Sequence, residues 1–598
     1  MNSTNNIPSV PLPAVFGRGL TKRRSWHYQL LFVAVLSGLI LLCILWLRIP
    51  TPEGKHLQIG QLIQEAEYER ALQKSFAYFL ELGDSSMQAE LVEPLYAQER
   101  VRDYYESGNP LMWIGPGGLN ARGQILYERI RQADAVGLMP RDYHYSTLQK
   151  LVDSLGRRAD GYTSIRAEFL LTDAFCLYQS HLHYGKLDST ATRPYWGIGG
   201  HAGQQLDPMV ALNELYRGAD LEAYLTSLEP GHVHYRYLKR ATLRYLSLRD
   251  KMGDWPKVPA MKEIQPGDTH VYVPMVRARL QAEGLLASTK QDMPEWYETD
   301  LARAVAQFQQ QHGLAPDSQL TQATQQAMNV PLEERIAQMR LNLERWRWVP
   351  ADWGPNYLWV NIPEYKLIAY QAGEPVLEMR TIVGKKKRRT PFISSRLNEV
   401  VFNPYWTVPT ALIYQDILPR AGYNPAFLAA MDMELVDASG QAIYLNYDNL
   451  WALSLGTSGL SIRQRPGAAN SLGRMLFRFP NNWQVYLHDT PDKWAFDLPM
   501  RALSSGCVRL QQPEAVLDLL MSTVPDWQTA EKESLLGANG PRNHVRTIPG
   551  VFGIHLYYFT ARADPEGQVY FLPDVYEIDP GRRQLLEQPY RQARQAGV

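Results

Sequence analysis

A cysteine set among small residues, with a histidine upstream of it, is the feature of this chain best suited to chemistry. Cys507 lies in the run LSSGCVRL (503–510), and His488 lies in YLHDT (486–490). A thiolate attacks acyl carbons well, and a nearby imidazole can take the thiol proton and return it to a leaving group. The two residues therefore predict acyl transfer by a cysteine nucleophile.

A disulfide is the structural alternative for Cys507. The chain has three cysteines, and Cys43 lies in an apolar run near the N-terminus, so Cys176 is the partner that such a disulfide would need. Cys176 lies in LLTDAFCLYQSHLHYGKL (170–187), where apolar residues recur at helical spacing. We expect Cys176 to be a buried helix residue, which favours a free thiol at Cys507.

The N-terminal segment predicts a membrane anchor. Residues 28–47 are an uncharged apolar run long enough to cross a bilayer, and Arg18, Lys22, Arg23 and Arg24 precede it. The positive-inside rule leaves residues 1–27 in the cytoplasm and the rest of the chain outside. A cleavable signal peptide is the rival interpretation, but the run ends in LWLRIP rather than in a small-x-small site.

The composition indicates a multidomain globular protein. The 598 residues include 61 basic and 61 acidic side chains, so no basic excess points to nucleic acid. His181 with His183, and His232 with His234, lie two apart, a spacing that points in different directions on a helix. We therefore predict no metal site.

The pattern of apolar residues divides the chain into an α+β series of domains. After the anchor we expect a helical scaffold domain at 56–263, because apolar residues between 62 and 80 follow a 3.6-residue period. A small domain follows at 264–331. The remainder at 332–580 is mostly β, with hairpins in YLWVNIPEYKLIAYQAG (357–373) and around Glu566, and with a helical insertion at about 410–460. Residues 581–598 are assigned to a C-terminal tail.

The small domain at 264–331 resembles a known module. Its phrase AVAQFQQQHGLAPDSQLTQAT (304–324) predicts a helix, a break at Gly313 and a second helix that begins near Ser318. The phrase resembles the three-helix peptidoglycan-binding domain that is attached to many cell-wall enzymes. The resemblance implies attachment to wall peptide or glycan, and a plain helical hairpin is the alternative.

Five phrases in order resemble a YkuD-type L,D-transpeptidase domain. They are IVGKKKRRTP, VFNPYWTVP, RQRPGAANSLGRMLFRFPN, YLHDTP and SSGCVRL, all within residues 382–510. With the anchor, the helical region, the small domain and the insertion, the chain is similar to the large YcbB-like branch. Cys507 would then be the nucleophile, His488 its general base and acid, and the backbone N–H groups around Gly506 and Cys507 the oxyanion donors.

The resemblance also implies residues around the reacting pair. Arg509 matches a position that holds the active-site loop or the substrate carboxylate, and a structural salt bridge is an equal alternative. Ser505 replaces the histidine that many members carry, which leaves His488 as the base. We expect a main-chain carbonyl, rather than the Asp489 side chain, to orient the imidazole. The predicted substrate-binding residues are Arg509, Ser505, Tyr486, Trp406 and Asn470.

The implied reaction is 3→3 cross-linking of peptidoglycan stem peptides. Cys507 would release the terminal D-alanine of a tetrapeptide and pass the acyl group to a diaminopimelate-type amine of a second stem, without a cofactor. The implied setting is the inner membrane, with the catalytic part in the periplasm, carbapenem sensitivity, and other wall synthases as partners. The alternatives are an L,D-carboxypeptidase or endopeptidase, a lipoprotein-to-wall attaching enzyme, and an inactive wall-binding scaffold. Papain-like peptidases are disfavoured because they place Cys before His.

Overall fold

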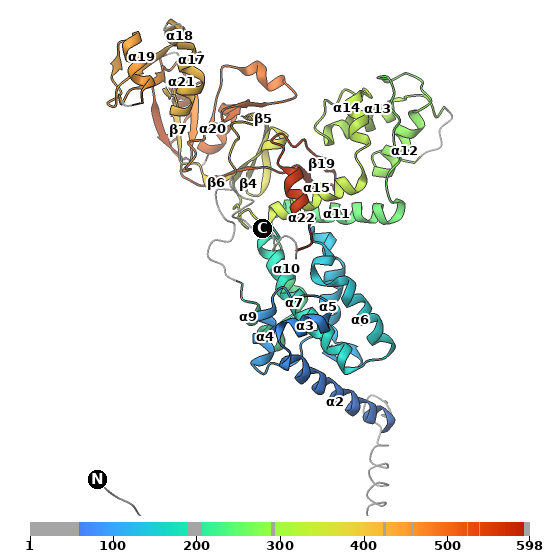
Figure 1. The fold of residues 1–598 in the computed structure, drawn as a ribbon. Helices are drawn as coiled ribbons and strands as arrows, with labels where there is room; N and C mark the ends of the chain where they lie inside the picture. The colour runs from blue at the N-terminus through green and yellow to red at the C-terminus, as the bar shows by residue number, and fades with distance from the viewer. Residues whose placement is uncertain are drawn as a thin grey trace, which may run out of the picture.

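The computed structural model describes residues 59–187, 206–288, 293–421, 426–456, 458–522, 524–537 and 539–590. Figure 1 shows the helices of residues 59–227 at one end and the later domains at the other, with α11 (Val233–Met252) and α15 (Leu332–Trp346) between them. The anchor predicted at 28–47 lies outside the described residues. Among the described residues, no helix has the length and apolar character needed to cross a membrane.

The scaffold is built around one long buried helix, α7 (Gly161–Tyr184). The Asp160 side chain caps the start of α7 by accepting a hydrogen bond from the Thr163 N–H. Cys176 is 4% exposed on this helix, and both Cys176 and Cys507 are free thiols, so the disulfide alternative is not formed. The other scaffold elements are α2 (Ile59–Glu81), α3 (Asp84–Leu91), α4 (Gln98–Glu106), β1 (Ile114–Gly115), β2 (Gly118–Leu119), α5 (Ala121–Arg131), α6 (Tyr145–Arg157), α9 (Pro208–Tyr216) and α10 (Leu221–Ser227).

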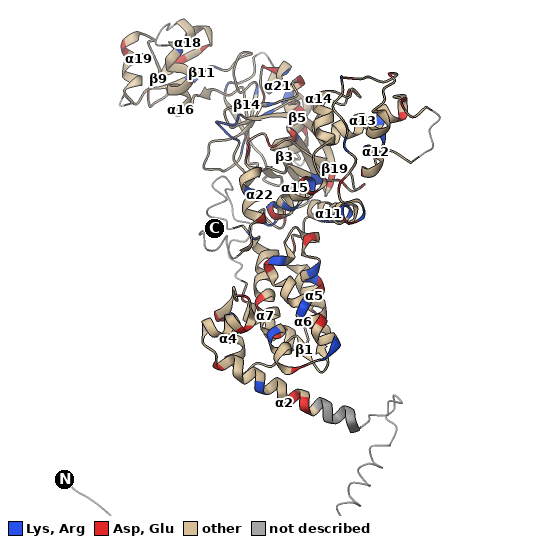
Figure 2. Cartoon of the chain, turned by 45° about the vertical axis from the view of Figure 1, so that its right-hand side comes forward, with Lys and Arg blue, Asp and Glu red and all other residues tan. Residues whose placement is uncertain are grey.

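Charges of both signs cover the scaffold. Figure 2 shows Lys and Arg interspersed with Asp and Glu along its helices. Such mixed faces are typical of solvated helix surfaces.

Helix α15 joins the scaffold to the β domain. Glu333 and Glu334 occupy its first turn, where the helix dipole favours negative charge. Near its end the buried Glu344 accepts a hydrogen bond from the Leu187 N–H, at 2.8 Å. Helix α11 packs along α15, and its Tyr235 belongs to the same hydrophobic core as the large sheet. The two helices therefore pack together and share the hydrophobic core of the β domain.

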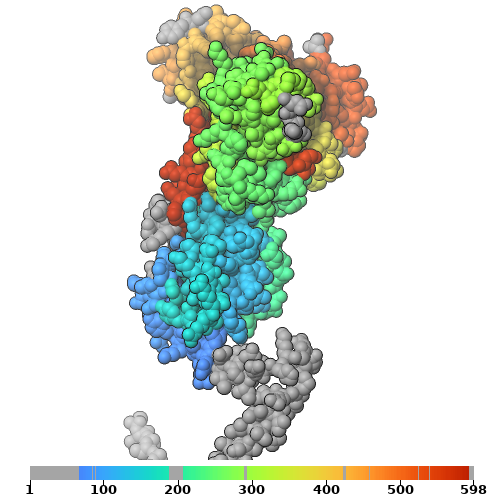
Figure 3. Space-filling view, turned by 90° about the vertical axis from the view of Figure 1, so that its right-hand side faces the viewer, coloured from blue at the N-terminus to red at the C-terminus, as the bar shows by residue number. Residues whose placement is uncertain are grey.

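The small domain has three helices, α12 (Val273–Glu283), α13 (Thr299–Gln311) and α14 (Gln322–Met328), around a core of their own. The expected start near Ser318 is wrong, because Ser318 has a positive φ of 63° and Thr321 is the residue that caps α14. Figure 3 shows this domain (green) above the scaffold (blue to cyan).

In the small domain, the phrase at residues 304–324 that resembles peptidoglycan-binding domains has a structural role. The Gln309 side-chain amide donates to the Asp317 carboxylate at 2.8 Å and to the Thr324 hydroxyl at 3.1 Å. His312 is buried and stacks on Phe308 of its own domain, and it also contacts the Phe571 ring of the β domain. These residues of the phrase therefore hold the loop between α13 and α14 and seat the domain on its neighbour.

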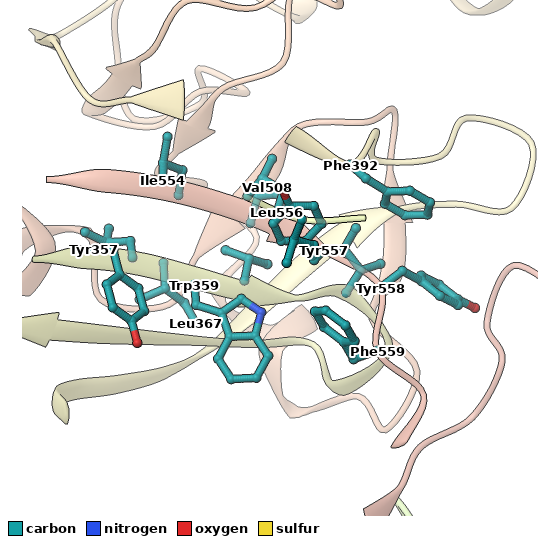
Figure 4. Packing of buried hydrophobic residues seen from close by; sticks show 14 of the residues in the cluster. Tyr357, Trp359, Leu367, Phe392, Val508, Ile554, Leu556, Tyr557, Tyr558 and Phe559 are labelled. Atoms are coloured by element: carbon teal, nitrogen blue, oxygen red, sulfur yellow. The ribbon is translucent and has the colours of Figure 1, made fainter. Parts of the chain in front are cut away.

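The β domain is an 11-stranded sheet, and its core is shown in Figure 4. Trp359 and Leu367 come from neighbouring antiparallel strands, and Ile554 and Leu556 lie on a strand that runs parallel to the first of them. The predicted hairpin at 357–373 is confirmed. The strands along the sheet are β16 (His544–Thr547), β7 (Glu399–Phe402), β12 (Met475–Arg478), β13 (Leu487–His488), β15 (Val508–Leu510), β5 (Glu374–Gly384), β4 (Lys366–Gln371), β3 (Tyr357–Asn361), β17 (Gly553–Tyr557) and β6 (Ile393–Arg396), while β14 (Ala502–Ser504) pairs with β5.

Further elements surround the sheet. The predicted hairpin around Glu566 is confirmed as β18 (Ala561–Ala563) and β19 (Val569–Phe571). Helices α20 (Pro513–Met521) and α21 (Thr529–Leu536) follow the β14–β15 region in sequence. Helix α22 (Asp579–Glu587) packs on α15 and occupies the start of the segment assigned to the tail.

The inserted segment is not only helical, which corrects the expectation. Residues 406–464, called here the insertion domain, contain a four-stranded sheet in the order β10-β9-β11-β8 and a separate hydrophobic core. The short strands alternate with helices, and this alternation hides them in the sequence. Its elements are β8 (Trp406–Thr407), α16 (Thr410–Leu412), a π-helical turn (Ile413–Ile417), α17 (Leu418–Ala421), α18 (Ala426–Ala430), β9 (Met433–Val436), β10 (Ala442–Ile443), α19 (Tyr447–Ser454) and β11 (Ser461–Gln464).

Candidate active site

Two adjacent parallel strands bring His488 and Cys507 together. Strand β13 ends at His488, and strand β15 begins at Val508, directly after Cys507. The strands pair in parallel, with Leu487 opposite Val508 and His488 opposite Arg509. Cys507 lies two residues before Arg509, so the strand alternation places both side chains on the face that carries His488. Both His488 and Cys507 line one cavity of about 540 Å³.

The His488 imidazole is buried and held in one tautomer. Its Nδ1–H donates to the Asp489 main-chain carbonyl at 2.5 Å, which leaves Nε2 as the proton acceptor. The expectation that a main-chain carbonyl orients the ring is confirmed. The Asp489 carboxylate lies elsewhere, accepting from the Arg474 N–H and pairing with Lys493.

Burial sets the protonation of the pair. Desolvation, followed by the nearby Arg509 charge, lowers the pKa of His488 to about 4. Desolvation also raises the pKa of the Cys507 thiol above its ordinary value, although the Tyr486 backbone and Arg509 act in the opposite direction. At neutral pH the cavity therefore holds a neutral thiol and a neutral imidazole, and the imidazole can act as a base.

The main chain before Cys507 corrects part of the predicted oxyanion site. Gly506 has a φ of +122°, which L side chains rarely adopt. Its N–H donates to the Ser504 hydroxyl at 3.1 Å, and its carbonyl accepts from the Thr390 hydroxyl at 2.8 Å. The Gly506 N–H is thus already used. The Cys507 N–H has no acceptor among the described residues and is the better candidate donor.

Arg509 lines the cavity and forms an ion pair. Its Nη1 donates to the Asp492 carboxylate at 2.9 Å, on the loop that follows His488. Its Nε is buried and has no hydrogen-bond partner. The ion pair matches the loop-holding and salt-bridge alternatives, while a role in binding a substrate carboxylate stays a prediction.

The other predicted substrate residues divide into two groups. Trp406 and Ser505 line the cavity. Tyr486 does not, because its side chain packs with Val401, Leu472 and Leu476. Asn470 does not line it either. It is 1% exposed, and it braces the loop before β12 by donating to the Arg465 carbonyl at 2.9 Å and accepting from the Leu472 N–H at 2.8 Å.

A basic turn forms one rim of the cavity, a role that the sequence reasoning missed. Lys385, Lys387 and Arg388 line the cavity, although the run 385–389 reads as an exposed loop. Arg388 reaches across to the insertion domain, where it binds both Asp416 carboxylate oxygens and the Gln415 amide, and it also donates to the Ser505 hydroxyl at 3.1 Å. The sequence did contain one indication of this role, because residues 385–389 lie in IVGKKKRRTP, one of the five phrases that resemble the L,D-transpeptidase domain. Asp416 carries no such signal.

The ion pair between Arg388 and Asp416 gives a first prediction. Asp416 is 43% and Arg388 18% exposed, so the pair should contribute at most about 1 kcal/mol to stability. In Asp416→Ala we expect faster amide hydrogen exchange across residues 410–421 and slower acylation, with an almost unchanged melting temperature.

Asp432→Ala is the matched control for that prediction. It removes an exposed ion pair with Arg465, and both of these partners lie in the insertion domain or next to it in sequence. Equal exchange in the two variants would show that the Arg388 contact does not hold the insertion domain against the turn.

Among the described residues, no group of three or more His, Cys, Asp or Glu side chains could hold a metal ion. His232 and His234 are buried, and both stack on Trp346. These two histidines therefore have packing roles.

Comparison with known families matches three parts of the chain. Residues 99–241 match the family described as "Scaffold domain", residues 269–328 match "Putative peptidoglycan binding domain", and residues 355–528 match the YkuD family, "L,D-transpeptidase catalytic domain". The third match contains both His488 and Cys507.

One curated relative, described as "Putative L,D-transpeptidase", comes from Haemophilus influenzae. It is 34% identical over 253 residues, which cover 41% of this chain and 49% of the relative. The chain thus matches about half the length of this relative.

Two solved structures also align. One is an L,D-transpeptidase (residues 123–326) from Xylanimonas cellulosilytica, at 15% identity over 50% of this chain and 99% of that one, with a TM-score of 0.14. The other is a fused Zn-dependent amidase/peptidase/peptidoglycan-binding protein from Clostridium acetobutylicum, at 10% identity over 50% and 100% of the two chains, with a TM-score of 0.14. These TM-scores are too low to support any structural argument.

The chain therefore carries a catalytic domain of the L,D-transpeptidase family. The domain is of the YkuD type and is combined with a peptidoglycan-binding domain and a scaffold domain, an arrangement that fits the YcbB-like architecture.

Proposed function

We propose that the protein is a peptidoglycan L,D-transpeptidase that forms 3→3 cross-links through a thioester at Cys507. The observation that carries the proposal is the pairing of β13 and β15, which places a neutral imidazole and a thiol in one cavity within the domain that matches this family.

The first half of the reaction is acylation. The Cys507 sulfur attacks the carbonyl carbon of the third residue of a stem tetrapeptide, while His488 Nε2 takes the thiol proton. The Cys507 N–H stabilises the oxyanion that develops on the carbonyl oxygen. The tetrahedral intermediate then expels the amine of the terminal D-alanine, which receives the proton from His488, and a thioester remains.

The second half passes the acyl group to an amine. The side-chain amine of a diaminopimelate-type residue on a second stem attacks the thioester carbonyl and gives a proton to His488. The thiol leaves and takes that proton back, so the enzyme is regenerated. Water in place of the amine would give the hydrolase alternative, and a lipoprotein amine the wall-attachment alternative.

The proposed setting follows from the N-terminal sequence. The apolar run at 28–47, with its preceding basic residues, supports a single-pass anchor that leaves the catalytic domain in the periplasm, facing the wall. The peptidoglycan-binding domain and the scaffold would then span the distance between membrane and wall, where other wall synthases could be partners.

Product analysis tests the proposal. The full-length protein is incubated with disaccharide-tetrapeptide, and the products are read by mass spectrometry. We expect a dimer that has lost one D-alanine, with a 3→3 linkage in its fragments. Tripeptide alone would favour the carboxypeptidase alternative, and unchanged substrate would favour the inactive scaffold.

A further inference from the structure

The rim of the active-site cavity carries positive side chains that form no ion pair with a described residue. Lys385, Lys387, Arg388 and Arg509 line the cavity, while Asp416 is the one carboxylate among its described lining residues. Arg388 is paired with Asp416, and Arg509 is paired with Asp492. Lys385 and Lys387 make no ion pair with a described residue, although the Lys385 charge, after the Arg388 hydrogen bond and charge, helps to lower the pKa of Asp416.

The turn that presents these lysines is fixed to the cysteine loop. The Lys385 N–H donates to the Ser504 carbonyl at 3.0 Å, and the Arg388 N–H closes the turn on the Lys385 carbonyl at 2.8 Å. At Gly384, a Cβ atom would come within 2.3 Å of the Arg388 carbonyl oxygen, so the tight turn needs glycine. The Thr390 hydroxyl then binds the Gly506 carbonyl. The backbone that carries the two lysines is therefore held at a fixed place relative to Cys507.

The lysine between them faces another way. Lys386 pairs with Glu577 and does not line the cavity. The three consecutive lysines thus divide into two that line the cavity without an ion-pair partner and one that is neutralised outside it.

We propose that Lys385 and Lys387 form a carboxylate-binding rim that selects acyl donors whose third residue carries an ionised side-chain carboxyl group. This inference rests on the proposed function, because the stem peptide supplies the carboxylates. An ammonium group binds a carboxylate as a point charge without fixed geometry, which suits a peptide side chain that enters an open cavity. The rim acts in substrate binding, and the bond-making step remains with Cys507 and His488.

The test measures acylation of the full-length protein by intact mass, over a range of donor concentrations. Two disaccharide-tetrapeptide donors are compared, one with the free side-chain carboxyl group on its third residue and one with the carboxamide. We expect the wild type to reach half-saturation with the carboxylate donor at an about tenfold lower concentration. In the double variant Lys385→Ala/Lys387→Ala this preference should vanish, while the maximal acylation rate stays within about twofold.

Matched variants distinguish carboxylate binding by Lys385 and Lys387 from a general effect of positive charge on this turn. Lys386→Ala removes the same charge from the same turn and should keep the wild-type preference, and Lys385→Arg/Lys387→Arg should keep it as well. Added salt should shrink the preference in the wild type, because exposed charges are screened. A preference that survives in the double alanine variant, or that is lost equally in Lys386→Ala, would overturn the inference. No acylation of the wild type by either donor would instead refute the proposed function, and the inference with it.

Discussion

Cys507→Ala should abolish formation of the acyl-enzyme and reduce cross-linking more than about a thousandfold. The Cys507 thiol lines the same cavity as His488, whose imidazole is held in the acceptor tautomer. Cys507→Ser should be nearly as inactive, because a hydroxyl is a much weaker nucleophile next to the same base. The measurement is the intact mass of the protein after incubation with the tetrapeptide donor.

Cys176→Ala is the control for that result. Cys176 is buried in the scaffold, and desolvation raises the pKa of its thiol well above the usual range, so it is inert. This variant should form the adduct as the wild type does. An adduct of equal yield in Cys507→Ala would contradict the assignment of the nucleophile.

His488→Gln should lower the rate of acylation at pH 7 by about a hundredfold to ten-thousandfold, the usual contribution of a positioned general base. The wild type should also show a characteristic pH dependence. Because the pKa of His488 is lowered to about 4, the imidazole stays neutral and competent at neutral pH, and acylation should fall only as the pH drops through about 4.

The variant should respond to pH in a different way. Without its base, only the ionised thiol reacts, and burial raises the pKa of Cys507. The rate for His488→Gln should therefore climb steadily from pH 6 to pH 9, where the wild type is flat. His544→Gln, on β16 and away from the cavity, is the control and should match the wild type. A half-maximal wild-type rate near pH 6.5 would show that His488 is not shifted.

The chemistry of this chain was easier to predict from sequence than the shape of its pocket. Cys507 and His488 lie in two short phrases on adjacent strands, and the β alternation explains why the Asp489 carbonyl, rather than its carboxylate, binds the ring. The hairpin at 357–373 follows from local pattern and turn residues in the same way.

The pocket walls depend on contacts between distant segments. Lys387 and Asp416 come to line the same cavity as Cys507 only after the sheet and the insertion domain have folded, and no local pattern marks Asp416. Asn470, by contrast, was predicted to bind substrate but does not line the cavity. An asparagine close to a catalytic motif was assigned to substrate, but its amide satisfies backbone groups of its own loop. The strands of the insertion domain were missed because each is four residues or fewer.

A thioester on Cys507 is the most direct test of the proposed mechanism. The full-length protein is mixed with tetrapeptide donor in the absence of an acceptor amine, quenched in acid, and digested for peptide mass mapping. We expect a tripeptide-derived acyl adduct on the peptide that contains Cys507, removed by hydroxylamine and released when an acceptor stem is added before the quench. An adduct on any other residue, or turnover with no adduct at Cys507 under any quench time, would contradict it.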